Sequence, residues 1–356
     1  MINREYAREI KKLMPSRVSG GDPDSPVSMW KEMDRLRGYP EPTSVVIFRT
    51  KGCSWYNFSS CSMCGYFNDV SSSIKEENLY KQVDYAFRSL GDTRILKVFT
   101  SGSFLDPLEV PIGVREYFME KAKGNLDKLL VESRTEYVNT RNLSAIGKYG
   151  VDLRIAIGLE SSNDIIIRES INKGSTFAKY IESARVLKDL GLELRTYLLL
   201  KPPFISEKAS VEDMIKSVRD VSNISDDVSV NPMNIQKNTM VEKLWKKGLY
   251  RPPRLWSIAR ILLETRNMGT QVISYPTGGN KLRGAHNEED SLDLLNLIFS
   301  ASLSQDFNEL EAFYNSSDRS SDRSAYMNNL DLEDSMIFQQ DLDRLVDRLG
   351  TASMTV

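Results

Sequence analysis

The feature that most constrains the fold of this 356-residue chain is a unit that repeats along it: a short β-branched or leucine-rich run, a polar turn and a helical stretch. Strands that alternate with helices form a parallel sheet joined by right-handed crossovers. An α/β fold is therefore expected. The predicted strands span residues 44–50, 95–100, 129–132, 151–157, 192–200, 228–230 and 271–273.

Polar or glycine-rich residues follow these strands, at the end where α/β barrels carry their active sites. Ser101 and Gly102 form a small-residue turn that lets backbone groups approach a ligand, although a plain strand–helix turn has the same composition. Glu132 and Glu160 end apolar strands, where a carboxylate is costly to bury unless it is paired or liganded. An arginine partner explains each glutamate equally well, but their occurrence at successive strand ends favours a shared site.

All three cysteines of the chain lie in one loop after the first predicted strand. Cys53, Cys61 and Cys64 form a C-x7-C-x2-C run. Three clustered thiolates suit a [4Fe–4S] cluster in which one iron has no protein ligand. Such an open iron can bind a small molecule, and radical enzymes place S-adenosylmethionine there.

Zinc is the strongest alternative for this loop. A structural zinc site uses four protein ligands, and the sole histidine, His286, lies far downstream. A disulfide would leave one thiol unpaired, and nothing indicates an oxidising compartment. A nucleophilic cysteine would need a positioned base. The spacing and the ligand count therefore favour iron–sulfur chemistry.

The overall composition is that of a soluble protein. The formal net charge is −2 and the pI is about 5.8, which argues against coating nucleic acid through bulk charge but leaves room for a local basic surface. Charged residues follow Met1 at once, so no signal peptide is expected. The apolar stretch at 294–303 is interrupted and too short to span a bilayer. We expect a cytoplasmic protein without membrane contact.

A basic stretch at 243–260 is interleaved with aromatic residues, as RNA binding requires positive charge and stacking groups. The alternative is an amphipathic helix pair whose tryptophans face the core and whose cations are solvated. The basic run at 8–17 can likewise be a solvated helix face. The candidate nucleic-acid-binding residues are Lys243, Lys246, Lys247, Arg251 and Arg254.

Several motifs together resemble the radical S-adenosylmethionine (radical SAM) superfamily, in the branch of the elongator catalytic subunit. They are most similar to the radical SAM subunits of archaeosine synthase. The motifs are the cysteine loop at 52–66, ESRTEY at 132–137, GLES at 158–161, KPPF at 201–204 and YRPP at 250–253. The resemblance implies a partial (β/α)6 barrel at 43–286, between an N-terminal helical extension at 1–42 and a C-terminal helical extension at 287–356.

By motif position, the resemblance implies that Cys53, Cys61 and Cys64 hold the cluster. Ser101 and Gly102 match the stretch that cradles the methionine amino group, although the usual Gly-Gly-Glu is absent. Met63 stands where an aromatic residue often packs near the adenine. The positions that match contacts to the ribose or methionine are Glu132, Ser133 and Glu160.

The implied reaction is a step of tRNA modification. A 5′-deoxyadenosyl radical takes a hydrogen atom from the lysine carbon next to the nitrogen in lysine-modified preQ0 at D-loop nucleotide 15. Loss of a second electron and scission of the C–N bond then leave archaeosine, and the lysine remnant departs as an aldehyde or a cyclic imine. Arg195 and Lys201 are the candidates for binding the lysine carboxylate. The implied partners are tRNA, the lysine-transferring archaeosine synthase subunit and an external electron donor.

Two other functions stay open from the sequence. One is a radical SAM enzyme that acts on another tRNA or on a small molecule; methylthiolation is disfavoured because no cysteine remains for a second cluster. The other is a non-catalytic, zinc-stabilised RNA-binding module.

The resemblance ends near residue 288, and the chain beyond it has its own pattern. A helix is expected at 290–302 and a turn-like segment at 315–324. Apolar and charged residues alternate at helical spacing over 336–349, which predicts an acidic helix that docks on the barrel or on a partner.

Overall fold

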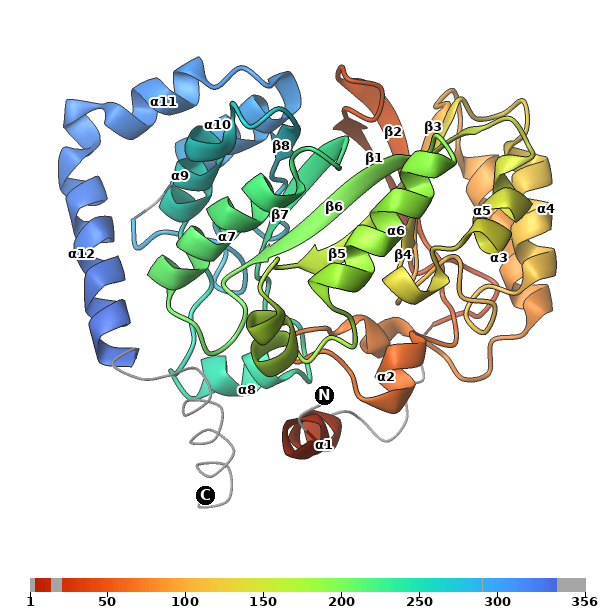
Figure 1. Cartoon of the computed structure of the whole chain (residues 1–356), viewed down its shortest axis with the longest axis horizontal. Coiled ribbons are helices and arrows are strands. Elements are labelled where there is room, and N and C mark those ends of the chain that lie inside the picture. Colours follow the sequence, from red (N-terminus) through yellow and green to blue (C-terminus); the bar gives the residue numbers. More distant parts are fainter. Residues whose placement is uncertain (1–3, 14–20, 290, 338–356) are drawn as a thin grey trace.

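The computed structural model of the protein describes residues 4–13, 21–289 and 291–337 (Figure 1). Its centre is one mixed sheet in which the strands follow their order in the sequence. The first strand is antiparallel to the second, and every later pair is parallel. The strands are β1 (Ser28–Asp34), β2 (Glu41–Ile47), β3 (Ile95–Phe99), β4 (Lys128–Ser133), β5 (Asp152–Glu160), β6 (Glu193–Leu200), β7 (Asp227–Pro232) and β8 (Gln271–Ile273).

Crossover helices connect the parallel strands, and all of them except α8 cover the outer face of the curved sheet (Figure 1). Figure 1 shows α6 lying along β5 and β6, and the same arrangement repeats around the sheet. The crossover helices are α3 (Glu76–Ser89), α4 (Ile112–Ala122), α5 (Thr140–Gly147), α6 (Phe177–Asp189), α7 (Glu207–Val221), α8 (Met240–Lys246) and α9 (Leu255–Thr265). The remaining α-helices are α1 (Arg4–Leu13), α2 (Ser54–Phe58), α10 (Leu292–Ser304), α11 (Asn308–Asn315) and α12 (Ser320–Ile337).

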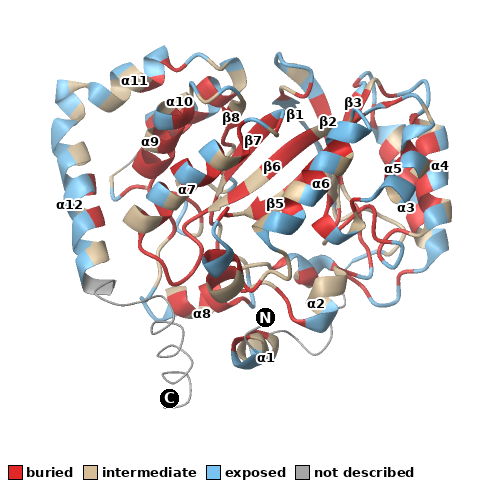
Figure 2. Ribbon diagram, in the orientation of Figure 1, coloured by how far each residue is buried: buried red, intermediate tan, exposed pale blue. Residues whose placement is uncertain are grey.

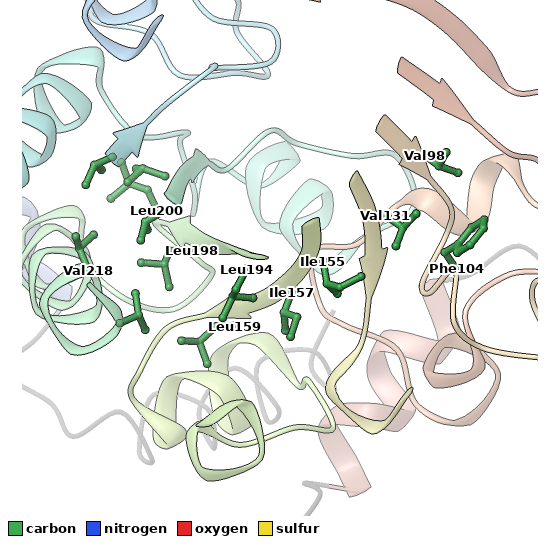
Figure 3. Packing of buried hydrophobic residues seen from close by; sticks show 14 of the residues in the cluster. Val98, Phe104, Val131, Ile155, Ile157, Leu159, Leu194, Leu198, Leu200 and Val218 are labelled. Atoms are coloured by element: carbon green, nitrogen blue, oxygen red, sulfur yellow. The ribbon is translucent and has the colours of Figure 1, made fainter. Parts of the chain in front are cut away.

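The main hydrophobic core lies between the sheet and these helices. Val98, Val131 and Ile155 come from three adjacent strands and pack in a row against the helical layer (Figure 3). The outer helix faces are exposed, while the strands other than β1 are mostly buried (Figure 2). Burying one such aliphatic side chain contributes about 1.5–3 kcal/mol, so this layer holds the open sheet in its curved form.

The structure confirms the expected α/β partial barrel with helical extensions. All seven predicted strands are present, and β8 adds one parallel strand to the six of the expected barrel. The N-terminal extension contains helix α1 and also strand β1, which the sequence analysis did not predict. Strand β1 lies at the edge of the sheet, and its mostly exposed, charged sequence lacks the apolar run by which the other strands were recognised.

The C-terminal extension begins with α10, close to the expected helix at 290–302. The expected turn at 315–324 is wrong in part, because a short 3-10 segment, Ser317–Arg319, leads directly into α12. Helix α12 is held by tertiary contacts with α7 that its local composition does not reveal, such as Lys208–Asp331 at 2.8 Å. Most of the segment 336–349 lies outside the described residues.

A layer of buried charges fills the barrel near the amino ends of the strands. The Asp34 carboxylate of β1 forms ion pairs with the Lys97 ammonium of β3 at 2.6 Å and with the Arg195 guanidinium of β6 at 2.9 Å. Arg195 also binds Asp227 of β7 at 2.7 Å. Burial alone would raise the pKa of Asp34, but Arg195 and Lys97 hold it well below its usual range. Strand β1 thus supplies an acid that neutralises cations inside the barrel.

No helix among the described residues combines the length and apolar character needed to cross a membrane.

Candidate active site

The cysteine loop leaves the carboxyl end of β2 and contains its own helix. Cys53 precedes α2, which occupies most of the interval before Cys61. Cys64 lies just ahead of a 3-10 turn, η1 (Tyr66–Asp69). The seven-residue gap between the first two cysteines is therefore a helical turn that brings the chain back to the same site.

A second segment, far along the chain, holds this loop in place. It is the π-helix η3 (Ile166–Ile171) and the residue after it, Asn172. The Asn172 side chain donates to the carbonyl oxygen of Ser60 at 2.7 Å, and its own backbone carbonyl accepts from the Trp55 indole at 2.9 Å. Single π-helical turns are frequent at functional sites. The sequence analysis missed this segment, since its apolar residues resemble an ordinary helix.

The three thiols are partly or largely removed from water and lie among cations. Burial raises the pKa of Cys61 to about 11, while nearby Lys173 and Arg134 act in the opposite direction. Burial likewise raises the pKa of Cys53 and of Cys64. Cysteine must lose its proton to bind metal, so positive charge beside buried thiols favours the thiolate ligands of an iron–sulfur cluster.

The cysteine loop offers three thiolate ligands close to the turn after β3. The described residues contain no group of three histidine, cysteine or acidic side chains placed to hold one ion. A [4Fe–4S] cluster takes each thiolate on a different iron, so its ligands do not converge on one point. Gly102 adjoins the site closely, because a Cβ at this position would lie 2.7 Å from the Cys53 sulfur.

Glu109 organises the turn that follows β3, and the sequence analysis missed it. Its buried carboxylate accepts the backbone N–H groups of Ser101 at 2.8 Å, Gly102 at 3.1 Å and Ser103 at 2.7 Å. Thr50, just before the cysteine loop, donates its hydroxyl at 2.8 Å. Burial raises the pKa of Glu109 to about 7. The turn is thereby tied to the start of the cysteine loop.

The predicted carboxylates Glu132 and Glu160 both face this region. Burial, and then Glu109, raise the pKa of Glu132 to about 8. Glu160 forms an ion pair with Lys173 at 2.6 Å, and its φ of 72° coincides with a bulge between β5 and β6. Bulges of this kind often re-aim a side chain beside an active site. Both carboxylates act electrostatically on a cysteine or on Tyr66, so both lie near the cysteine loop.

Ser133 and Arg134 follow Glu132. The Ser133 hydroxyl lies 2.9 Å from that of Ser103 and so joins the turns after β3 and β4. Arg134 is 7% exposed, and its Nε donates to Glu136 at 2.6 Å. Its Nη2 has no hydrogen-bond partner among the described residues. A buried guanidinium with an unused donor beside the cysteines is suited to an anionic group of a bound ligand.

Met63 lies in the apolar lining of the site, packed with Leu199 and Ile205. The aromatic residue of the loop that faces the carboxylates is Tyr66, which is 54% exposed. It interacts electrostatically with Glu132, Cys64 and Glu160. The sequence analysis did not single out Tyr66. Its position two residues after Cys64 could have indicated that it lies beside the cysteines.

The structure does not bring Arg195 or Lys201 to the cysteine site. Arg195 is 2% exposed and is saturated by Asp34 and Asp227 near the amino ends of the strands. Lys201 is 1% exposed, with its ammonium 3.1 Å from Glu207 and 3.0 Å from Glu333. Each of these cations is already paired with acidic side chains, so binding of the lysine carboxylate by Arg195 or Lys201 stays a prediction that would require these pairs to open.

The five candidate RNA-binding residues separate into two groups. Arg254 is 5% exposed and pairs with Glu207 at 2.9 Å, while Arg251 is half-buried beside Glu288. Arg254 is therefore held in the interior, while Arg251 stays partly exposed. The other group lies on or directly after α8, where Lys246 and Lys247 are exposed and Lys243 is half-buried.

Comparison with known proteins gives consistent matches. The model of the radical SAM superfamily matches residues 47–218. The archaeosine synthase subunit beta of Methanosarcina acetivorans is 38% identical over 289 residues, which cover 79% of this chain and 82% of the relative. The subunit of that name from Thermococcus kodakarensis is 34% identical over 273 residues, covering 73% and 84%.

More distant similarities extend to other proteins. Elongator complex protein 3 of Mus musculus is 27% identical over 168 residues, which cover 47% of this chain and 28% of that protein. The solved structure of methylornithine synthase superposes with a TM-score of 0.48 at 14% identity, covering 74% of this chain and 69% of that one.

Proposed function

Since the chain belongs to the family of archaeosine synthase beta subunits within the radical SAM superfamily, we propose that it cleaves the C–N bond of lysine-modified preQ0 in tRNA to give archaeosine. The observation that carries the proposal is the 38% identity over 79% of the chain. Its expected partners are tRNA, the lysine-transferring archaeosine synthase subunit and an external electron donor.

Cys53, Cys61 and Cys64 would hold a [4Fe–4S] cluster with S-adenosylmethionine beside it. Bound together, these groups would supply a 5′-deoxyadenosyl radical able to take a hydrogen atom from the lysine carbon next to the nitrogen. The protein's own contribution is to exclude water and to hold that C–H bond near the radical carbon.

The remaining side chains have binding roles in this proposal. The turn at Ser101 and Gly102, ordered by Glu109, offers a preorganised edge for the methionine part of the cofactor. Arg134 is suited to its carboxylate, since the guanidinium has an unused donor. The residues suited to the ribose, the adenine and the amino group are Met63, Tyr66, Glu132, Ser133 and Glu160.

The decisive experiment is an anaerobic assay of the reconstituted protein with a reductant, S-adenosylmethionine and tRNA that carries lysine-modified preQ0. We expect archaeosine in the tRNA, a released lysine remnant and 5′-deoxyadenosine. The matched controls are tRNA with unmodified preQ0 and the Cys61→Ala protein. Formation of 5′-deoxyadenosine while the lysine stays attached would refute the proposed reaction and favour another substrate.

The zinc-stabilised RNA-binding module makes a different prediction. Reconstitution of the proposed enzyme should give about four iron atoms per chain and brown absorbance. Stoichiometric zinc with no bound iron after anaerobic reconstitution would instead support the non-catalytic alternative.

A further inference from the structure

Helix α1 lies against the cysteine loop, at the same end of the molecule as α2 and α8 (Figure 1). The Tyr6 hydroxyl donates to the carbonyl oxygen of Ser170 in η3 at 2.9 Å. The Lys11 ammonium donates to the carbonyl oxygen of Tyr56 in the cysteine loop and lies 4.7 Å from the centre of its ring. The N-terminal helix is thus part of the wall of the site.

The same helix packs on α8 through an apolar contact. Tyr6 and Ile10 form a buried cluster with Phe204, Met240 and Leu244. Because these side chains face inward, the polar sides of α1 and α8 are both turned to solvent. Figure 2 shows this division on α1, with buried and exposed residues on opposite sides.

The exposed sides of the two helices are basic in a chain that is acidic overall. Residues 4–13 carry four basic and two acidic side chains, and residues 240–247 carry three basic and one acidic. Glu9 is paired with Lys12, and Glu242 with Lys246 and Arg283, while Glu5 is an exposed acid on α1 between Arg4 and Arg8. Within the described part of the chain, Arg4, Arg8 and Lys247 are exposed and form no ion pair.

We propose that α1 and α8 form a basic ridge that binds the phosphate backbone of the RNA substrate beside the cysteine loop. The ridge consists of Arg4, Arg8, Lys12, Lys246 and Lys247. This inference rests on the proposed function, since it takes the substrate to be a tRNA. Cations that release counterions from phosphates provide most of the sequence-independent affinity for nucleic acid.

The position of the ridge favours RNA over an acidic protein partner. Helices α1, α2 and α8 lie at the same end of the molecule as the cysteine loop (Figure 1), so an RNA whose nucleotide reacted there would have its neighbouring phosphates close to the ridge. The direct contacts between α1 and the cysteine loop keep the ridge at a constant distance from the chemistry. A protein partner is under no such constraint.

The test compares two reconstituted full-length variants. The ridge variant carries Arg4→Gln, Arg8→Gln, Lys246→Gln and Lys247→Gln. The control carries Lys179→Gln, Arg185→Gln and Lys188→Gln, which remove exposed cations from α6 on the outer face. Binding of a tRNA transcript is measured by fluorescence anisotropy at several salt concentrations, and iron content and melting temperature establish that both variants fold.

We expect the ridge variant to bind tRNA about tenfold or more weakly. Its slope of log affinity against log salt should be smaller by about one for each phosphate that the variant no longer neutralises. The control should stay within about twofold of the wild type.

Equal affinity and slope in the ridge variant would overturn the inference while leaving the proposed reaction intact. Normal tRNA binding combined with failure to retain the lysine-transferring partner in a pull-down would also overturn it, because the ridge would then be a protein-docking surface.

Discussion

At the scale of single residues, Glu109 supplies the acid that the turn after β3 lacks in its own sequence. The turn reads Ser101-Gly102-Ser103, and the carboxylate that orders it comes from the following loop. Three backbone donors and the Thr50 hydroxyl compensate for the cost of burying this carboxylate. A carboxylate from the same connection between β3 and α4 thus orders the turn.

Gly102 gives a residue-scale prediction about the cysteine site. Gly102→Ala would place a Cβ 2.7 Å from the Cys53 sulfur, so the cysteine or the turn must move. We expect reconstituted Gly102→Ala to retain less than about half of the wild-type iron, because cluster ligands must keep their geometry. Iron analysis and absorbance measure this decrease.

The matched control for Gly102 is Gly147→Ala at the end of α5. No atom lies within 4 Å of a Cβ added at Gly147. We expect the control to keep full iron and to gain up to about 1 kcal/mol in unfolding free energy, as alanine favours helix. If both variants reconstituted equally well, the close approach of Gly102 to Cys53 would have no functional consequence.

At the scale of elements, the cysteine loop is stable because two remote segments support it. Helix α2 occupies most of the interval between Cys53 and Cys61. Asn172, which follows η3, hydrogen-bonds to the loop, and α1 donates a hydrogen bond to it through Lys11. Short helices are marginal by themselves, so α2 depends on these contacts.

Asn172 offers a test of this support. Asn172→Ala removes the side-chain bonds to Ser59 at 2.9 Å and Ser60 at 2.7 Å, and it leaves an alanine at a φ of 59°. We expect a decrease of about 1–3 kcal/mol in stability and a loop more open to protease. Asn125→Ala, an exposed loop position, is the control. Limited proteolysis that cuts both variants at the wild-type rate would contradict the proposed support.

Helices α7, α9 and α12 meet at Glu207, which makes stability depend on pH. Burial alone would raise the pKa of Glu207, but Lys201 and Arg254 lower it to about 2. A carboxylate with a lowered folded pKa stabilises the protein above its unfolded pKa, about 4.3, and this stabilisation is lost as pH falls toward the folded pKa.

We expect the wild type to lose on the order of 3 kcal/mol through Glu207 over this pH window. Glu207→Gln should be less stable at neutral pH and should lose less on acidification. Urea unfolding at a series of pH values from neutral down to about 2 measures both effects. Glu120→Gln, at an exposed position on α4, should follow the wild-type curve. An unchanged acid dependence in Glu207→Gln would assign the effect to other groups.

At the scale of the whole molecule, strand β1 completes an otherwise parallel barrel. Its Asp34 lies between Lys97 and Arg195 from two other strands, so an edge strand balances charges inside the sheet. Removing one partner from a buried ion pair leaves the other charge uncompensated, which is far costlier than breaking a surface pair.

We therefore expect Asp34→Asn to lower the unfolding free energy by about 3–5 kcal/mol. Asp127→Asn weakens only surface pairs, with Arg94 and Arg37, and should cost less than about 1 kcal/mol. Denaturant unfolding of the two variants gives the comparison. Equal decreases would show that the interior network does not hold the barrel together.

The amino-acid sequence by itself determined the α/β partial barrel, its parallel strands and the three cysteines of the site. These features depend on local apolar periodicity and on spacing within one loop, both of which are visible along the chain. The carboxylates Glu132 and Glu160 were also predictable, since each ends an apolar strand.

Only the tertiary structure decided the partners of the charged residues. Arg195, Lys201 and Arg254 had the composition of ligand-binding groups, yet each is neutralised by an acid that lies far away along the chain or comes from another element. The contacts that bring Glu109, Asn172 and α1 to the cysteine site likewise appear only in the folded structure. Electrostatic and hydrogen-bond partners depend on distances in space, which the spacing of residues along a sequence does not specify.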